Sequence, residues 1–221
     1  MKTDFQKAKA FIFDLDYTLI DSSEGIVHCF NEARKRAGES EVSAEKIKAR
    51  IGIPIEQTFE LYGSDGPLAR RDDFRKLARE GAMAERSFLL PGVKEAIPAF
   101  AEKGFRLAVA STKSHGEIEA ILKRLELNSF FEEIVGSDEV QNAKPAPDSL
   151  LLLLEKMGLA AEEAVYVGDH AVDVQAARGA GMPVVAVRGG PVTEEELKKE
   201  LPDVLVNNVA GILDMLDAGL R

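Results

Sequence analysis

The stretch FIFDLDYTL, residues 11–19, decides how the rest of the chain is interpreted. Its first three residues form a short apolar run, whose brevity and β-branched content predict a buried strand. Asp14 and Asp16 come directly after it. In an open parallel sheet, ligands bind beyond the carboxyl ends of the strands. Asp-x-Asp alone is a common turn or capping pattern, so a ligand site here depends on which residues stand at the ends of the other strands.

Further short apolar runs predict strands of the same kind. They are residues 107–110, 134–135, 164–167, 184–187 and 204–206. Between most of them lie stretches with apolar residues at three- and four-residue spacing, which predict helices over 93–101, 118–125 and 149–157. Strands that alternate with helices predict an α/β fold, with a Rossmann-like, mostly parallel sheet and helices on both faces.

One long interval breaks this alternation. No convincing core strand is found between Phe13 and Arg106, and a structureless loop of that length would argue against the assignment. The interval has the apolar spacing of helices, which are expected over residues 24–37, 43–51, 55–61 and 70–85. We therefore predict that residues 21–88 form a small α-helical cap domain, inserted into an α/β core of residues 1–20 and 89–221.

Length and charge restrict the possible partners. The chain has 221 residues, enough for one α/β core with a small insertion, and a formal net charge of −10. Its Lys and Arg residues are scattered, so a nucleic-acid partner is not expected. It has no run of about 18 apolar residues that would span a membrane. The N-terminus lacks a signal-peptide pattern and Cys29 is the single cysteine, which together predict a cytoplasmic protein.

Reactive side chains stand after the next three predicted strands as well. Ser111 and Thr112 come after the second strand, Lys144 lies beyond the third, and Asp169 and Asp173 come after the fourth. Each has an ordinary structural interpretation: Ser111 and Asp169 could cap helices, and Lys144 and Asp173 could be solvated. Their joint occurrence at successive strand ends favours a shared site over these separate interpretations.

The residue types in this set suit phosphoryl transfer. A carboxylate such as Asp14 can attack phosphorus and form an acyl-phosphate. Asp16 could protonate the leaving oxygen and then activate water. Ser111 can donate a hydrogen bond to a phosphoryl oxygen, and Lys144 can neutralise charge on the phosphate and on Asp14. We therefore predict Asp14, Asp16, Ser111 and Lys144 as catalytic residues, with Ser111, Thr112 and Lys144 binding phosphate.

The aspartates also predict a metal site. Mg²⁺ prefers oxygen ligands and commonly takes only one or two protein carboxylates, with water and substrate phosphate completing the shell. Asp14 and Asp169 would supply the carboxylates, and Asp173 would be an additional or indirect ligand. The backbone carbonyl of Asp16 could add another oxygen.

Four segments of the chain resemble the motifs of a known family. Residues 13–19, 111–113, 144–148 and 168–173 are similar to the four motifs of the haloacid dehalogenase-like superfamily, most closely to its phosphoglycolate phosphatase-like and β-phosphoglucomutase-like branch. The resemblance covers nearly the whole chain. It implies a Rossmann-like core, a helical cap inserted after the first motif, an aspartyl-phosphate intermediate and a Mg²⁺ cofactor.

Two details concern the substrate. The family usually has Gly where this chain has Tyr17, and we expect the ring beside Asp16 to narrow the pocket or to touch the cap. Arg50 lies in a segment that resembles the part of the cap that meets substrate in this branch. We therefore predict Arg50 as a substrate-facing cation.

The resemblance leaves several activities to compare. A dehalogenase would not need Asp16, because halide departure requires no protonation. A phosphonatase typically lacks that acid and uses a cap lysine that we do not identify here. A sugar phosphomutase keeps both aspartates and stays open, although such mutases often carry Gly-Val-Ile where this chain has residues 17–19. A non-catalytic regulatory protein on the same fold would commonly lose the nucleophile or the metal aspartates.

The favoured prediction is a Mg²⁺-dependent phosphatase that acts on a small phosphorylated metabolite. Phosphoglycolate, a sugar phosphate, a nucleotide and pyrophosphate all remain possible substrates, because selectivity lies in the cap rather than in the fold. The oligomeric state is not predicted.

Overall fold

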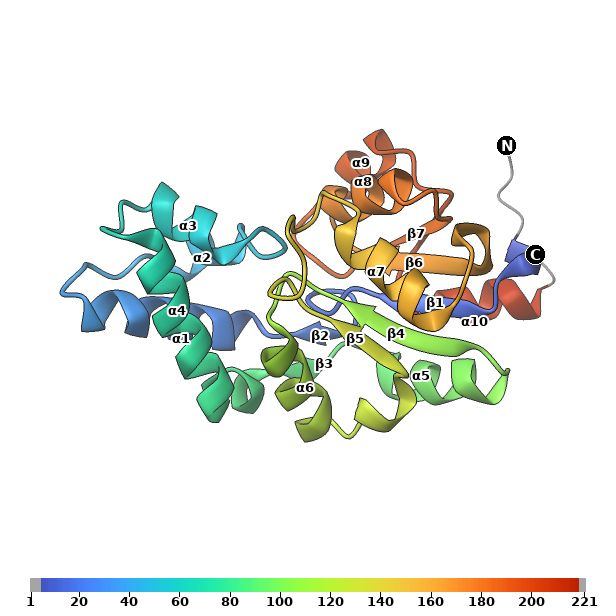
Figure 1. Cartoon of the computed structure of the whole chain (residues 1–221), viewed down its shortest axis with the longest axis horizontal. Coiled ribbons are helices and arrows are strands. Elements are labelled where there is room, and N and C mark those ends of the chain that lie inside the picture. Colours follow the sequence, from blue (N-terminus) through green and yellow to red (C-terminus); the bar gives the residue numbers. More distant parts are fainter. Residues whose placement is uncertain (1–4, 219–221) are drawn as a thin grey trace.

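The computed structural model describes residues 5–218, and its larger part is built around a six-stranded sheet (Figure 1). The strand order is β5-β4-β1-β6-β7-β8, and all neighbouring strands are parallel. The strands are β1 Ala10–Phe13, β4 Arg106–Ala110, β5 Glu133–Val135, β6 Ala164–Gly168, β7 Val184–Val187 and β8 Val204–Val206. Each contains one of the predicted apolar runs, so the Rossmann-like α/β core is confirmed.

Helices cover both faces of this sheet (Figure 1). Phe11 and Phe13 point to the face packed by α5, α6 and α10, whereas Ala10 and Ile12 point to the face packed by α7 and α8. Strand residues alternate between faces, so a strand covered on both sides must be apolar throughout, as β1 is. The helices of this part are α5 Val93–Glu102, α6 His115–Arg124, α7 Asp148–Met157, α8 Ala171–Gly179, α9 Glu194–Lys199 and α10 Ala210–Asp217.

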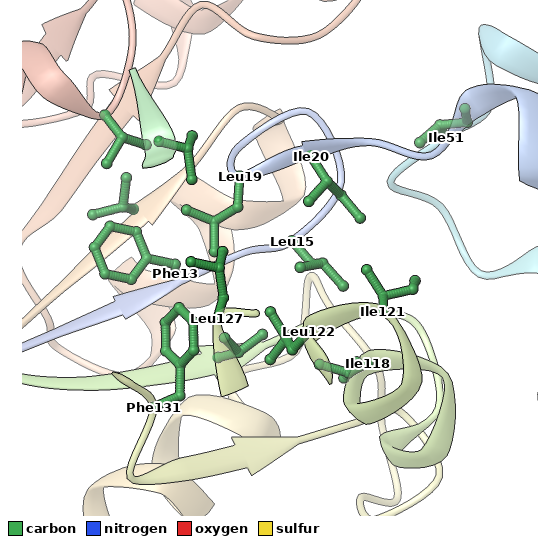
Figure 2. Close-up of a cluster of buried hydrophobic side chains, with 14 of the residues drawn as sticks. Phe13, Leu15, Leu19, Ile20, Ile51, Ile118, Ile121, Leu122, Leu127 and Phe131 are labelled. Atoms are coloured by element: carbon green, nitrogen blue, oxygen red, sulfur yellow. The ribbon is translucent and has the colours of Figure 1, made fainter. Parts of the chain in front are cut away.

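Figure 2 shows how the loop after β1 is anchored. Leu15, Leu19 and Ile20 are fully buried in a cluster with side chains of β1 and α6, including Phe13 and Leu122. The backbone N–H groups of Leu19 and Ile20 both donate to the carbonyl of Leu15, at 2.9 and 3.1 Å, and close a tight turn. The apolar residues of the first motif therefore fix the backbone that carries its two aspartates.

The predicted helical insertion leaves this core and returns to it through a second, two-stranded sheet. Its strands, β2 Ile20–Asp21 and β3 Phe88–Leu89, pair antiparallel. Between them lie the helices α1 Ser23–Arg36, α2 Ala44–Lys48, α3 Ile55–Leu61 and α4 Pro67–Leu77, which extend to one side of the core in Figure 1. Phe30 on α1 stacks on Phe59 of α3, with ring centroids 4.1 Å apart, and Phe59 also contacts Phe74 on α4. The insertion thus has an aromatic centre of its own, and its exact limits as a domain stay a prediction.

The last predicted helix of the insertion, over residues 70–85, is wrong in detail. The regular helix α4 ends at Leu77, and a π-helical turn (Ala78–Ala82) and a 3₁₀ turn (Ala84–Arg86) come after it. Gly81 explains the break because its φ of 101° lies in a region that glycine adopts without strain. The strands β2 and β3 were not predicted, since two residues are too few to show a period.

Within residues 5–218, every helix is too short or too polar to cross a membrane.

Candidate active site

The predicted reactive residues lie at the carboxyl ends of neighbouring strands. β1 lies between β4 and β6, so Asp14 is flanked by the segments that carry Ser111 and Asp169. The backbone N–H of Asp14 donates to the carbonyl of Val167 on β6, at 2.8 Å. Asp14, Ser111, Lys144 and Asp169 are all at least 95% buried. The ordinary interpretation of Lys144 as a solvated side chain is therefore wrong.

Lys144 is the cation at the centre of the site. Its Nζ donates to Asp14 Oδ1 at 2.7 Å, to Asp173 Oδ1 at 2.6 Å and to the Tyr166 hydroxyl at 2.9 Å, so all three of its protons have acceptors. Burial alone would lower the pKa of Lys144, but the charges of Asp14 and Asp173 raise it well above the usual value. The ammonium group therefore keeps its charge inside the protein.

Asp14 is a carboxyl group in an environment that disfavours its ionised form. Burial raises its pKa to about 7, and the negative charges of Asp173 and Asp16 add to this, while Lys144 acts in the opposite direction. Asp169 shows the same effect: burial, together with repulsion from Asp173 and Asp14, raises its pKa well above the usual range. Its Oδ1 accepts a hydrogen bond from the Thr18 hydroxyl at 3.3 Å. The single positive charge of Lys144 does not neutralise the negative charges of Asp14, Asp169 and Asp173.

The arrangement fits a divalent cation. Asp14, Asp169 and Asp173 each offer a carboxylate oxygen, and these oxygens lie within 4.8 Å of one another. An oxygen-only donor set of this kind is what Mg²⁺ and Ca²⁺ prefer. Asp173 is the least available of the three, because its Oδ1 accepts from Lys144 and Tyr166 and its Oδ2 accepts from the backbone N–H of His170 at 3.0 Å.

The Asp16 side chain is held separately from these carboxylates. Its Oδ2 lies 2.9 Å from Lys113 Nζ, in an ion pair whose two side chains are both 6% exposed. Its Oδ1 accepts a hydrogen bond from the Ser22 hydroxyl. Sequence reasoning missed both partners. Lys113 stands next to Ser111 and Thr112 at a strand end, which was a usable signal, whereas nothing in the pattern around Ser22 pointed to Asp16.

Ser111 is not a helix cap. Ser114 caps α6 instead, in a reciprocal capping box with Glu117, which is why this helix begins earlier than predicted. The Ser111 backbone N–H donates to the carbonyl of Val135 at 3.2 Å, and its Oγ accepts from the N–H of Lys113 at 3.3 Å. The hydroxyl hydrogen of Ser111 can therefore be directed at a ligand. Thr112 lines a pocket between the insertion and the sheet.

Tyr17 occupies a position where a side chain is strained. Its φ is 54°, in the left-handed region, which costs a residue with a Cβ roughly 1–2 kcal/mol and glycine very little. A Cβ on Gly189 would lie 1.7 Å from the Tyr17 carbonyl oxygen, so the segment after β7 packs directly on this peptide. Tyr17 lines a cavity with Pro91 and Arg188, apart from the pocket that contains Asp16. The expected narrowing of that pocket is not seen, whereas the alternative, a contact with the insertion, is: the Tyr17 side chain is hydrogen-bonded to Ser23, the first residue of α1.

The pocket that contains Asp16 lies between the insertion and the sheet, and has a volume of about 40 Å³. The insertion contributes Arg50 and Thr58 to its lining, and the core contributes Asp16, Lys113 and Glu117. The structure thus brings Arg50 to the same pocket as Asp16, and its role as a substrate-facing cation stays a prediction. Thr58 and Glu117 were not singled out in the sequence, where each has the surroundings of an ordinary helical residue.

Comparison with known proteins agrees with this architecture. The family model described as "Haloacid dehalogenase-like hydrolase" matches residues 11–187. The chain is 32% identical over 219 residues to a protein of Dickeya dadantii named "Probable phosphatase IndB", covering 95% of this chain and 94% of the relative. It is 30% identical over 236 residues to the phosphoglycolate phosphatase of Escherichia coli K12, covering 96% and 94%.

A solved structure supports the same assignment. A haloacid dehalogenase-like family hydrolase from Streptococcus pneumoniae superposes with a TM-score of 0.85 at 27% identity, covering 95% of this chain and 99% of that one. The motifs, the strand order and these similarities agree. The chain therefore belongs to the haloacid dehalogenase-like hydrolase family.

Proposed function

We propose that this chain is a phosphatase that hydrolyses the phosphate monoester of a small metabolite, with Asp14 as the nucleophile. The observation that carries the proposal is the buried Asp14 carboxylate at the end of the central strand, 2.7 Å from Lys144 and beside two further carboxylates. Lys144 counteracts the burial that raises the pKa of Asp14, and so helps to retain the ionised form that attacks phosphorus. The phosphatase names of the curated relatives support the same reaction class.

The reaction would proceed in two steps. A carboxylate oxygen of Asp14 attacks phosphorus, the bond to the ester oxygen breaks, and Asp16 gives its proton to the departing oxygen. This leaves an aspartyl-phosphate on Asp14. Asp16, now a carboxylate, then takes a proton from a water molecule that attacks the phosphorus, which releases inorganic phosphate and restores Asp14. The contacts of Asp16 with Ser22 and Lys113 hold its carboxyl group in position for both proton transfers.

The other predicted residues would bind the phosphate and the cation. Ser111 and Thr112 would donate to phosphoryl oxygens, and Lys144 would offset their charge. Asp14, Asp169 and the Asp16 carbonyl would hold Mg²⁺, which when bound would neutralise charge on the phosphate. Both oxygens of Asp173 already accept hydrogen bonds, so we assign it to the orientation of Lys144.

The proposal also covers location and partners. A buried, lone Cys29 is compatible with a reducing cytoplasm, and we keep the cytoplasm as the expected compartment. A small phosphorylated metabolite is the expected partner, without nucleic acid or membrane.

Turnover should depend on a divalent cation. With Mg²⁺, the protein is expected to release inorganic phosphate from p-nitrophenyl phosphate, and exhaustive chelation should reduce the rate by at least about 100-fold, since several kcal/mol of charge stabilisation would be lost. A colorimetric phosphate assay measures both. Full activity after chelation would contradict the metal site. Isomerisation of a sugar phosphate without net phosphate release would favour the mutase, and binding of phosphorylated metabolites without any turnover would favour the non-catalytic protein.

Magnesium should stabilise the fold more at pH 8 than at pH 5.5. The pKa of Asp14 is raised from an ordinary 3.8 to about 7, so the metal-free protein loses stability as pH rises through this interval, and below it a proton competes with the cation. Mg²⁺ at about 100 times its Kd contributes about 2.7 kcal/mol, which corresponds to roughly 5–10 °C in Tm at pH 8. Thermal unfolding of chelator-treated protein with and without Mg²⁺ measures the gain.

The matched control for this measurement is Asp169→Asn, which should lose most of the gain at both pH values. Equal gains at pH 5.5 and 8 in the wild type would contradict the role of Asp14 as a ligand.

A further inference from the structure

We infer that the pocket between the insertion and the sheet selects a short phosphate ester whose carbon chain carries hydroxyl groups, over one that carries a carboxylate. The inference rests on the proposed phosphatase function and adds the substrate class. Its basis is a set of polar side chains that the proposed chemical steps do not use: Arg50, Thr58 and Glu117.

These three residues share an unusual property. In each, one buried side-chain atom has no hydrogen-bond partner: Arg50 Nε, Thr58 Oγ1 and Glu117 Oε1. Buried polar atoms are nearly always paired, because leaving one unpaired costs free energy. All three residues line the same pocket, two from the insertion and one from α6. A ligand enclosed between the insertion and the sheet is the group that could supply partners to all of them.

The unpaired oxygen of Glu117 requires a hydrogen-bond donor on the ligand. Its Oε2 is occupied, since it accepts from the backbone N–H of Ser114 at 2.7 Å and from the Ser114 hydroxyl. The remaining Oε1 of this carboxylate can only accept a hydrogen bond. A ligand carboxylate has no proton to donate and would be repelled by this oxygen. A ligand hydroxyl can donate to it.

Arg50 and Thr58 set further requirements for the hydrogen bonds that the ligand must form. The Arg50 guanidinium only donates, and the Thr58 hydroxyl can donate or accept. A carbon chain with adjacent hydroxyl groups can donate to Glu117 and accept from Arg50. It therefore satisfies both sides of the pocket, whereas a carboxylate could satisfy Arg50 and Thr58 but not Glu117.

Two other charged side chains of the pocket already have partners. Lys113 pairs with Asp16 at 2.9 Å. The Arg75 guanidinium donates to the neutral Ser137 hydroxyl at 2.9 Å and keeps its positive charge. Among the charged groups that line the pocket, Glu117 retains an unpaired acceptor, which requires a proton donor on the ligand.

The volume limits the length of the ligand. About 40 Å³ is room for only a few water-sized groups, at roughly 10–15 Å³ each. Apolar side chains such as Ile51 and Phe74 form much of the remaining wall. A chain of about three or four carbons, as in glycerol phosphate, is the expected size.

The test compares substrates and variants under one set of conditions. For the wild type, kcat/KM for glycerol 3-phosphate should exceed that for phosphoglycolate and for phosphoethanolamine by at least about tenfold, because each poor substrate leaves a buried pocket atom unpaired. Glu117→Gln keeps an oxygen for Ser114 and turns an NH₂ group towards the pocket. It should reduce the glycerol phosphate to phosphoglycolate ratio by at least about tenfold.

The control is Glu119→Gln on the same helix, whose side chain is 47% exposed and pairs with Lys123. It should leave the ratio and the rate with p-nitrophenyl phosphate as in the wild type. A preference of the wild type for phosphoglycolate, phosphoethanolamine or a nucleoside monophosphate would overturn the inference, and so would an unchanged ratio in a folded Glu117→Gln protein. These outcomes leave the phosphatase function intact, whereas absence of phosphate release from p-nitrophenyl phosphate by the wild type would defeat the function itself.

Discussion

Replacing Asp14 by Asn is expected to reduce phosphate release by roughly 10⁴-fold or more, the scale seen when a covalent nucleophile is removed. The amide has nearly the same shape but is neutral, so it cannot form the acyl-phosphate. The variant should stay folded. Burial opposes ionisation of Asp14, as its pKa of about 7 indicates, and Lys144 keeps Asp173 as a partner.

Steady-state rates with p-nitrophenyl phosphate, together with an acid-quenched reaction on labelled substrate, measure this prediction. Label should be trapped on the wild type and not on the variant. Asp65→Asn changes an exposed aspartate of the insertion in the same way and should have no effect. A rate for Asp14→Asn within tenfold of the wild type would sink the assignment of the nucleophile.

Replacing Lys144 by Met is expected to abolish turnover and also to destabilise the protein by about 3–5 kcal/mol near neutral pH. Met keeps most of the volume but leaves Asp14 and Asp173 buried without their cation, and removal of one partner of a buried ion pair costs this much. In a chain of this size the loss corresponds to roughly 6–20 °C in Tm.

The pH dependence separates this explanation from a simple packing defect. The pKa of Lys144 is raised, so its stabilising charge is fully present below its unfolded pKa of about 10.4 and does not change between pH 5 and 8. In the variant, the carboxylates gain protons as pH falls, and the deficit relative to the wild type should shrink from pH 8 to pH 5.

Chemical unfolding at the two pH values measures the deficit. Lys123→Met, an exposed lysine on α6, is the matched control and should change stability by less than about 1 kcal/mol. A deficit for Lys144→Met that is the same at pH 5 and pH 8 would mean that lost packing, rather than uncompensated charge, explains the effect.

The sequence alone was sufficient for the fold and for the set of polar residues that lie together at the carboxyl edge of the sheet. Strands that are buried on both faces appear as uninterrupted apolar runs, so β1, β4, β6 and β7 could be recognised without any knowledge of their neighbours. Parallel strands place their carboxyl ends along one edge, so Asp14, Ser111 and Asp169 could be expected there together. Local spacing carried this information because both rules depend only on the order of residues along the chain.

The tertiary structure decided which groups these residues contact. Ser22 and Lys113 hold Asp16, Tyr166 shares Lys144 with Asp14 and Asp173, and Glu117 closes a pocket with Arg50 and Thr58. Such partners are brought together by the strand order and by the path of the insertion. The periodic spacing of apolar residues along the sequence contains no information about these contacts. The carboxylate pair of the first motif could thus be recognised in the sequence. That Asp14, the proposed nucleophile, contacts Lys144 while Asp16, the proposed acid, contacts Lys113 depends on distances that exist only once the chain has folded.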